Sequence, residues 1–301
     1  MKTHRSSAAL AIMTILALSI TAPAPAQVET LRAAAEAGTD GAAFDYGYAL
    51  TFPDETEPDY IVGRYWLSRA ADGGDPAANH VLGMIYRDGI GTDPDIDRAR
   101  AFFELAWQAG DAPGGYALAD LLIDAFEGEE AVAASILDAI ADDPDTGPQA
   151  ASMLAELLFF PPGDMTGDAE RASALALDAL RRDPDLIEAN YLLGLAAMQG
   201  VGMDADPDAA QDYWRAGAEG GDTLAMLALG DALRDGAGGD PDAVTALAWY
   251  AAAAALGDPD GEPAARDLAA NLTEAERLSA QGVSDEILGR LDREFSALPP
   301  D

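Results

Sequence analysis

Small and apolar residues recur along the chain in runs with helical spacing, and a similar run returns about every 36 residues. A glycine, or an alanine in its place, stands inside each of six such runs: Gly47, Gly83, Ala119, Ala155, Gly194 and Gly230. An aspartate closes four of the segments at the same spacing: Asp75, Asp111, Asp222 and Asp258. Self-similarity at a fixed period of this size predicts an all-α solenoid of about six helix-turn-helix units.

The sequence of each repeat predicts two helices. In the second repeat, the apolar run over 78–86 predicts a first helix that ends at Gly89 and Gly91, because glycine tolerates the left-handed conformation of a helix end. The glycine pair recurs at Gly200 and Gly202 and at Gly236 and Gly238. An Asp-Pro pair then predicts the start of the second helix, since aspartate accepts hydrogen bonds from free amides and proline suits the first turn. These pairs are Asp93-Pro94, Asp206-Pro207 and Asp240-Pro241, and Asp75-Pro76 predicts the start of a first helix in the same way.

The predicted second helices carry two columns of bulky side chains. The first column holds Trp66, Phe102, Tyr213 and Trp249, and the second holds Leu67, Phe103, Trp214 and Tyr250. Stripes at constant repeat positions predict a core between repeats rather than a ligand-stacking surface. A single unit cannot bury its own apolar face, so the stacking of units is expected to form the core.

The segment from Leu82 to Asp111, LGMIYRDGIGTDPDIDRARAFFELAWQAGD, resembles a Sel1-like repeat, a relative of the tetratricopeptide repeat. Residues 187–222 and 223–258 match the pattern almost as well, and 38–75 keeps part of it. Units 112–145 and 146–185 lack the glycine turn and look more like ordinary tetratricopeptide repeats. The resemblance implies a right-handed α/α superhelix over residues 27–258, and it implies a protein–protein adaptor.

The two ends of the chain differ from the repeats. Residues 1–26 combine a basic start, an apolar stretch over 8–20 and a final Ala-Pro-Ala, which predicts a cleaved signal peptide. A periplasmic protein is therefore expected, with secretion as the alternative. Residues 259–301 predict capping helices, one or two over 262–281 and another over 284–297, with Thr273 and Glu276 spaced as a capping box.

Charge and composition narrow the classes of function. The 54 acidic residues outnumber the 17 basic ones and give a formal net charge of −37. A chain this acidic is repelled by nucleic acid and by anionic lipid, so neither is expected as a partner, and no membrane insertion is expected after signal cleavage. The absence of cysteine excludes disulfides, thiolate nucleophiles and cysteine-ligated metals.

Few residues of the sequence are candidates for catalysis or metal binding. His80 would be the one histidine left after signal removal, too few for a zinc site, and without Lys2 the chain has no lysine for a serine β-lactamase. Asp93, Asp95, Asp97 and Glu104 have the spacing of a calcium loop, but Arg98 stands where the sharp turn needs glycine. We therefore expect no catalytic residue, no metal site and no cofactor.

The sequence predicts an exported adaptor that binds an unidentified protein or peptide in the solenoid groove. By analogy with the family, the groove would be lined by first-helix side chains: Asn79, His80, Tyr86, Asn190, Tyr191 and Gln199. The amides of Asn79 and Asn190 could grip an extended backbone. Two alternatives remain open: an envelope enzyme that acts on glycans through a carboxylate pair, and a self-associating scaffold.

Overall fold

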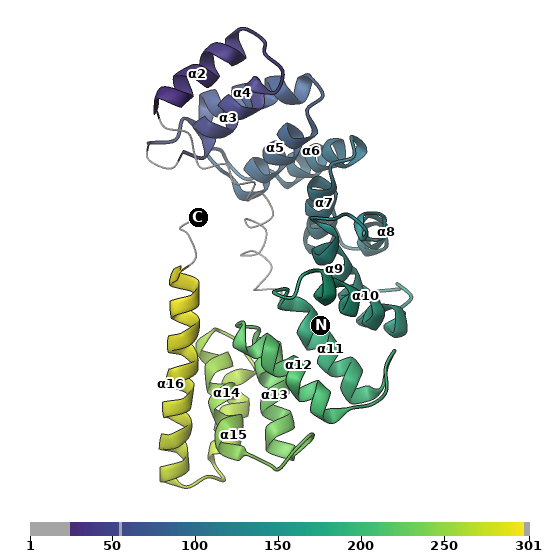
Figure 1. Cartoon of the computed structure of the whole chain (residues 1–301), viewed down its shortest axis with the longest axis vertical. Helices are drawn as coiled ribbons and strands as arrows, with labels where there is room; N and C mark the ends of the chain where they lie inside the picture. The colour runs from purple at the N-terminus through teal and green to yellow at the C-terminus, as the bar shows by residue number, and fades with distance from the viewer. Residues whose placement is uncertain (1–24, 54–55, 298–301) are drawn as a thin grey trace. The chain divides into compact units, whose positions relative to one another are not determined.

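The computed structural model describes residues 25–53 and 56–297, and all regular structure in these ranges is helical (Figure 1). In chain order the helices are α2 (Pro25–Glu36), α3 (Ala42–Thr51), α4 (Tyr60–Asp72), α5 (Pro76–Asp88), α6 (Ile96–Gln108), α7 (Ala112–Ala125), α8 (Glu130–Ile140), α9 (Gly147–Phe159), α10 (Ala169–Arg182), α11 (Glu188–Gln199), α12 (Pro207–Glu219), α13 (Thr223–Asp235), α14 (Ala243–Ala255), α15 (Gly261–Ala269) and α16 (Glu274–Ala297). The predicted all-α repeat architecture is confirmed, with two helices in each of the six expected units. Of the predicted leader, only the last two residues lie in the described ranges, in the first turn of α2.

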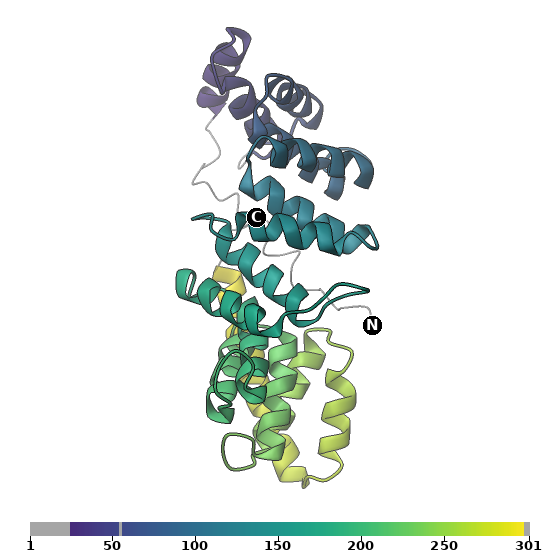
Figure 2. The ribbon, with the colours of Figure 1, turned by 90° about the vertical axis from the view of Figure 1, so that its right-hand side faces the viewer.

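The chain divides into two compact units, between Ala150 and Ala151. In the first unit, α3 packs on α4, α5 on α6 and α7 on α8, and each pair contacts the next, while α2 covers α3. In the second unit, α11 packs on α12 and α13 on α14, and both α15 and α16 lie against α14 (Figures 1 and 2). No helix of the described ranges combines the length and the apolar character that a membrane span requires.

Aspartates begin eight of the described helices, as the sequence predicted, and so account for part of the acidity. The side chains of Asp75, Asp111 and Asp222 accept hydrogen bonds from the first free amides of α5, α7 and α13. A second set does the same for the second helices: Asp59, Asp95, Asp168, Asp206 and Asp242. A carboxylate at a helix start satisfies an orphan amide and complements the helix dipole.

Two of the three predicted Asp-Pro starts are wrong by two residues. Asp206-Pro207 does begin α12, but α6 and α14 are capped by Asp95 and Asp242 rather than by Asp93 and Asp240. The prolines in question lie against the turn glycines instead, since a Cβ on Gly89 would come 2.7 Å from Cγ of Pro94. The ring therefore fills the space over a left-handed glycine (φ 72°), and the helix begins only after it.

The two columns of bulky side chains pack both between repeats and within them. Leu67 belongs to a buried cluster with Val81, Leu82 and Ile85 of the next repeat, which confirms the expected inter-repeat core. The same column also faces the first helix of its own repeat. Trp214, for example, lies over Gly194, and its Nε1 donates to the carbonyl of Tyr191 at 3.1 Å. In three repeats the glycine column thus makes room for a ring inside the helix pair, at Gly83, Gly194 and Gly230.

The C-terminal region caps the second unit, with one correction. The capping box is confirmed, because the amide of Thr273 donates to Oε2 of Glu276 at 2.7 Å. The break expected near 281–284 is wrong, since α16 runs unbroken from Glu274 to Ala297. Its buried side chains continue at helical spacing through that point: Ala280, Ser284, Ile287 and Leu291. A continuous apolar face on α14 therefore selects one long helix.

Candidate partner-binding surfaces

The two asparagines predicted to grip a partner are buried at the starts of α5 and α11. Asn79 is 6% exposed and Asn190 is 5% exposed. Nδ2 of Asn79 donates to the carbonyl of Asp75 at 3.2 Å, and Nδ2 of Asn190 donates to the carbonyl of Leu186 at 3.3 Å. Both amides are hydrogen-bonded to the backbone at their own helix starts, and a contact with a partner stays a prediction.

His80 is also buried. Its Nδ1 lies 3.4 Å from Oδ2 of Asp111, the cap of the following first helix, and its ring meets Phe103 edge-on at 5.9 Å. Tyr191 stands at the same repeat position in the second unit, beside the cap Asp222. In both halves of the chain this position therefore lies near the aspartate that caps the next first helix.

The remaining predicted residues lie at the other ends of their helices. Tyr86 stacks on Phe102 with parallel rings 5.5 Å apart, and the guanidinium of Arg98 lies 5.3 Å above Tyr86. Gln199 is exposed at the last position of α11. Seven or more residues of helix, roughly 10 Å, separate each of these from the asparagine of its own helix. The structure does not gather the predicted residues of a unit into one cluster.

One aromatic surface in the second unit brings a predicted residue together with a residue that the sequence did not suggest. The ring of Phe160 lies nearly parallel to that of Tyr191, at 6.5 Å and 20°. Phe160 is 44% exposed, while Tyr191 is half-buried. We call this pair the Phe160–Tyr191 platform. The run Phe159-Phe160-Pro161-Pro162, which replaces the usual glycine turn, was the signal that could have revealed it.

Acidic groups surround the platform. The pKa of Asp222 is raised to about 6. Burial is the main cause and the nearby carboxylates of Glu188 and Glu156 contribute, while amide hydrogen bonds from Ala225 and Leu224 act in the opposite direction. Burial also raises the pKa of the Tyr191 phenol, and the carboxylate of Asp222 adds to the effect. Aromatic faces next to carboxylates attract cations, so the surface suits a lysine or arginine side chain.

The Asp222 carboxylate has a structural role at the start of α13. Its Oδ1 accepts hydrogen bonds from the amides of Leu224 at 2.9 Å and Ala225 at 3.2 Å. The same capping role recurs at Asp75 and Asp111, which occupy the same repeat position. Asp222 is therefore a repeat cap in an acidic neighbourhood rather than a dedicated acid catalyst.

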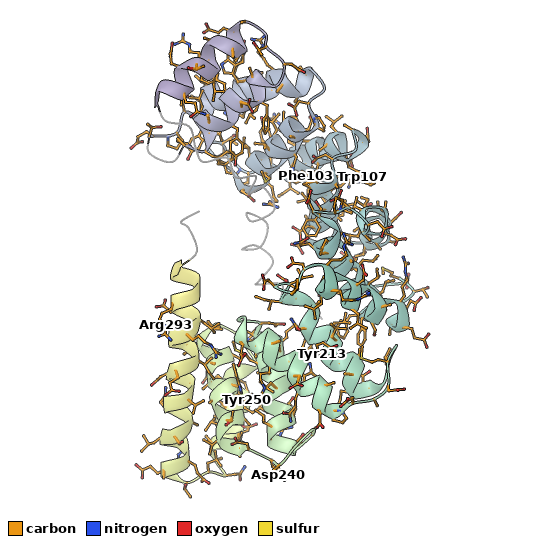
Figure 3. All side chains as sticks on the ribbon, viewed as in Figure 1. Phe103, Trp107, Tyr213, Asp240, Tyr250 and Arg293 are labelled. Carbon is orange, nitrogen blue, oxygen red and sulfur yellow. The ribbon has the colours of Figure 1, made fainter. Side chains whose placement is uncertain are left out.

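A second polar cluster joins α13 to α14. The hydroxyl of the buried Tyr250 donates to Oδ1 of Asp231 at 2.6 Å and accepts from Nη1 of Arg234 at 3.1 Å. Burial, followed by the hydrogen bond to Asp231, raises the pKa of the Tyr250 phenol above its ordinary range. Figure 3 shows Tyr250 inside the second unit, where the cluster ties the two helices of the last repeat together.

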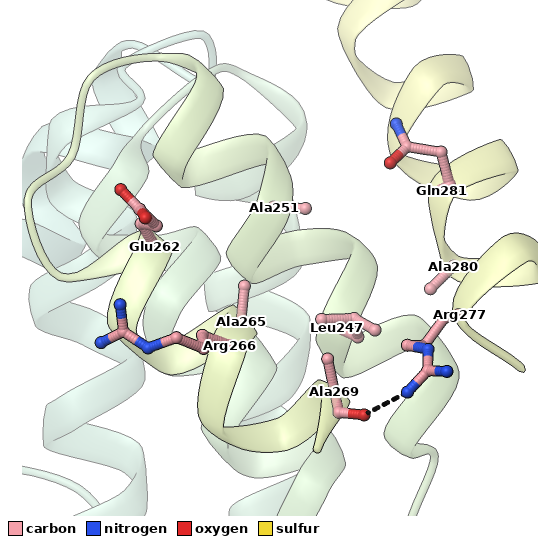
Figure 4. A pocket seen from close by; sticks show the side chains of 9 residues that line it. All are labelled: Leu247, Ala251, Glu262, Ala265, Arg266, Ala269, Arg277, Ala280 and Gln281. Atoms are coloured by element: carbon pink, nitrogen blue, oxygen red, sulfur yellow. Dashed lines mark hydrogen bonds between the residues drawn. The ribbon is translucent and has the colours of Figure 1, made fainter. Parts of the chain in front are cut away.

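A shallow pocket of about 300 Å³ lies between α14, α15 and α16 (Figure 4). Its walls are largely apolar, with Leu247 and four alanines, and Glu262 is the one carboxylate among its lining residues. Nη1 of Arg277 donates to the carbonyls of Ala269 and Leu272, both at 3.2 Å, and so closes the end of α15. Glycoside hydrolysis commonly requires two carboxylates across the bond, and this lining does not supply them.

The aspartates whose spacing resembles a calcium loop lie at the start of α6. Oδ1 of Asp95 accepts from the amide of Arg98 at 3.0 Å, and Oδ2 lies 3.2 Å from Nε of the same arginine. Asp97 lies in the first turn of α6. Across the residues that the structure describes, no group of three histidine or acidic side chains is placed to hold a metal ion.

The fold and these surfaces define a helical-repeat solenoid. The family model of the Sel1 repeat matches residues 41–75, 76–111, 187–222 and 223–258. The chain is a Sel1-repeat protein, as its sequence suggested.

Solved structures with the same fold include a protective antigen of uropathogenic Escherichia coli that displays an SLR fold. It is 22% identical over 92% of this chain, with a TM-score of 0.78, and this chain spans 60% of its length. A Sel1 repeat protein from Oxalobacter formigenes is 24% identical, with a TM-score of 0.55, over 66% of this chain and 80% of its own. Comparison with curated protein sequences finds no significant match.

Proposed function

We propose that the chain is an exported, non-catalytic adaptor that binds a protein or peptide partner through a cationic side chain seated on the Phe160–Tyr191 platform. The observation that carries this proposal is the exposure of Phe160, at 44%, in a stacked pair beside acidic groups. Large aromatic side chains that stay exposed and paired are typical of interaction sites. Sel1-repeat folds typically mediate protein–protein interaction, and the proposal follows that use.

The charge of the chain supports a basic partner. A net charge of −37 steers cationic surfaces toward the molecule and repels acidic ones. Glu188 is exposed at the start of α11, one helical turn before Tyr191. A lysine or arginine on the platform would therefore meet both an aromatic face and a carboxylate.

Export is part of the proposal. It is supported by Lys2, His4 and Arg5, by the apolar stretch over 8–20 and by the Ala24-Pro25-Ala26 site. If the leader is cleaved, N-terminal sequencing of the protein from a periplasmic fraction should begin at Gln27. A protein that keeps its leader, or stays in the cytoplasm, would contradict this part.

Capture from envelope extract tests the adaptor function. The immobilised protein is compared with a Phe160→Ser, Tyr191→Leu variant, since leucine stands at the equivalent position 227 of the last repeat. Leu256→Ser serves as the control, because Leu256 is also exposed (42%) in the second unit. A partner held at roughly 0.15 M salt by the protein and the control, but lost from the variant, is expected. Recovery only of basic proteins that wash off with salt would contradict it.

A further inference from the structure

The outward face of α4 in the first unit carries an apolar stripe. Ile61 is 76% exposed and Tyr65, one turn later, is 58% exposed. Arg69 continues the line, with its guanidinium 4.7 Å above the ring of Trp66, and Tyr65 meets the same ring edge-on at 5.5 Å. We call Ile61, Tyr65 and Arg69 the α4 stripe. The ring of Trp66 is buried, so two of the three side chains, those of Tyr65 and Arg69, rest on a core residue.

The repeat allows a comparison with the same positions elsewhere in the chain. On α6 and α12 the stripe positions are exposed and bear small or acidic residues, apart from one leucine: Asp97, Ala101, Leu105, Asp208, Asp212 and Ala216. On α14 they are apolar and largely buried: Val244, Ala248 and Ala252. The difference between α14 and the others is that α15 and α16 pack on it. On the one of these helices that other helices cover, the first two stripe positions are therefore both apolar.

The α4 stripe has apolar residues at those two positions, and the helices that pack on α4 are α3 and α5. We propose that the α4 stripe docks an amphipathic helix of a basic partner protein, in the way that α16 lies on α14 (Figure 1). A helix that presents apolar side chains at i and i+4 would meet Ile61 and Tyr65 along the 13 residues of α4. This surface belongs to the first unit and does not depend on the platform of the second.

The charge around the α4 stripe favours a basic partner. Exposed carboxylates flank the stripe at both ends, from Glu57 and Asp59 before it to Asp72 after it. A second copy would bring another chain of net charge −37 to the same face, and an anionic membrane would be repelled in the same way. A helix with lysine or arginine around its apolar face complements these carboxylates.

The test uses a leucine–lysine amphipathic peptide of about 14 residues, four helical turns, with a photo-crosslinker in its apolar face. Binding is measured at roughly 0.15 M salt to the protein and to an Ile61→Asp, Tyr65→Asp variant. Aspartate is the natural residue at these positions of α12, so the variant is expected to fold, as circular dichroism would verify. The control is Leu105→Asp, Val132→Asp, because both residues are about half exposed on second helices of the same unit (50% and 48%) and the charge changes equally.

Docking predicts at least about tenfold weaker binding to the stripe variant, unchanged or tighter binding to the control, and crosslinks within residues 60–72. General attraction to an acidic surface predicts that neither variant loses affinity, and that result would overturn the proposal. Crosslinks confined to the second unit would also overturn it. So would a concentration-dependent dimer that the stripe variant abolishes, since it would show that a second copy covers the face.

Discussion

The ring of Phe103 occupies the space that a side chain on Gly83 would need. A Cβ on Gly83 would come 3.0 Å from Cγ of Phe103 and closer still to two other ring atoms. The same relation joins Gly194 to Trp214 and Gly230 to Tyr250. Where the column holds Ala119 or Ala155 instead, the following helices α8 and α10 contain no aromatic residue. In these three repeats the glycine and the ring therefore form one structural element, whereas Gly47 of the first repeat faces Leu67.

Replacing Gly83 with alanine should destabilise the first unit. The added methyl must displace a fully buried ring, which costs about 1–3 kcal/mol, more than the roughly 1 kcal/mol that alanine gains in helix propensity. The unfolding midpoint in urea measures the effect. In the double variant with Phe103→Ala, the cost of the methyl should disappear.

Gly282→Ala in α16 is the matched control. A Cβ there meets no atom within 4 Å, so alanine should stabilise by up to about 1 kcal/mol through helix propensity alone. If Gly83→Ala stabilised the protein as much as Gly282→Ala, the close contact with Phe103 would be refuted.

The start of α6 can be tested with two neighbouring aspartates. Asp95→Ala removes the acceptor of the Arg98 amide and should cost about 1 kcal/mol. Asp93→Ala removes the same charge from an exposed position two residues earlier and should change the unfolding midpoint little. A larger loss for Asp93→Ala would restore the start that the Asp-Pro pair predicted.

Asp222 should make the second unit more stable in mild acid. Because folding raises its pKa to about 6, the protonated form stabilises the folded chain fully below about pH 4, and that contribution is lost as the pH rises through 6. Asp222→Asn keeps the acceptor for the α13 amides without the charge. It should be more stable than the original by about 2–3 kcal/mol at pH 7.5, with the difference vanishing near pH 4.

Thermal or urea unfolding at several pH values checks this prediction. The comparison between the two proteins removes the general repulsion of the many other acids, which changes in both alike. A difference that does not depend on pH would mean that Asp222 is ionised as easily in the folded chain as in the unfolded one.

The sequence predicts the helix pairs well because their boundaries are local. An aspartate cap or a left-handed glycine acts within a few residues, so positions such as Asp206 and Gly89 could be recognised without the fold. The errors come from contacts made at a distance. Pro94 looked like a helix start because its contact with Gly89 lies across the turn, and α16 looked broken because its unbroken apolar face matters only once α14 lies beneath it.

The candidate site was harder to predict for the same reason. Tyr191 is one of the residues predicted from repeat position, whereas Phe160 lies in a segment that departs from the repeat and meets Tyr191 only in the folded chain. Asn79 and Asn190 share a position that suggested a common grip on a partner. In the structure both side-chain amides donate to the backbone at their helix starts, and the contact with a partner stays a prediction. Comparison of repeat positions identifies residues that recur, whereas the proposed binding surface includes Phe160, which lies where one repeat differs from the others.

A calorimetric titration tests the central claim most directly. The protein is titrated at roughly physiological salt with a short peptide that carries one arginine, and with the same peptide carrying neutral citrulline in its place. We predict binding of the arginine peptide alone, and loss of that binding in the Phe160→Ser, Tyr191→Leu variant but not in Leu256→Ser. Equal heats from the two peptides, or an arginine peptide that binds the variant as well as the original, would contradict a cation-binding platform at Phe160 and Tyr191.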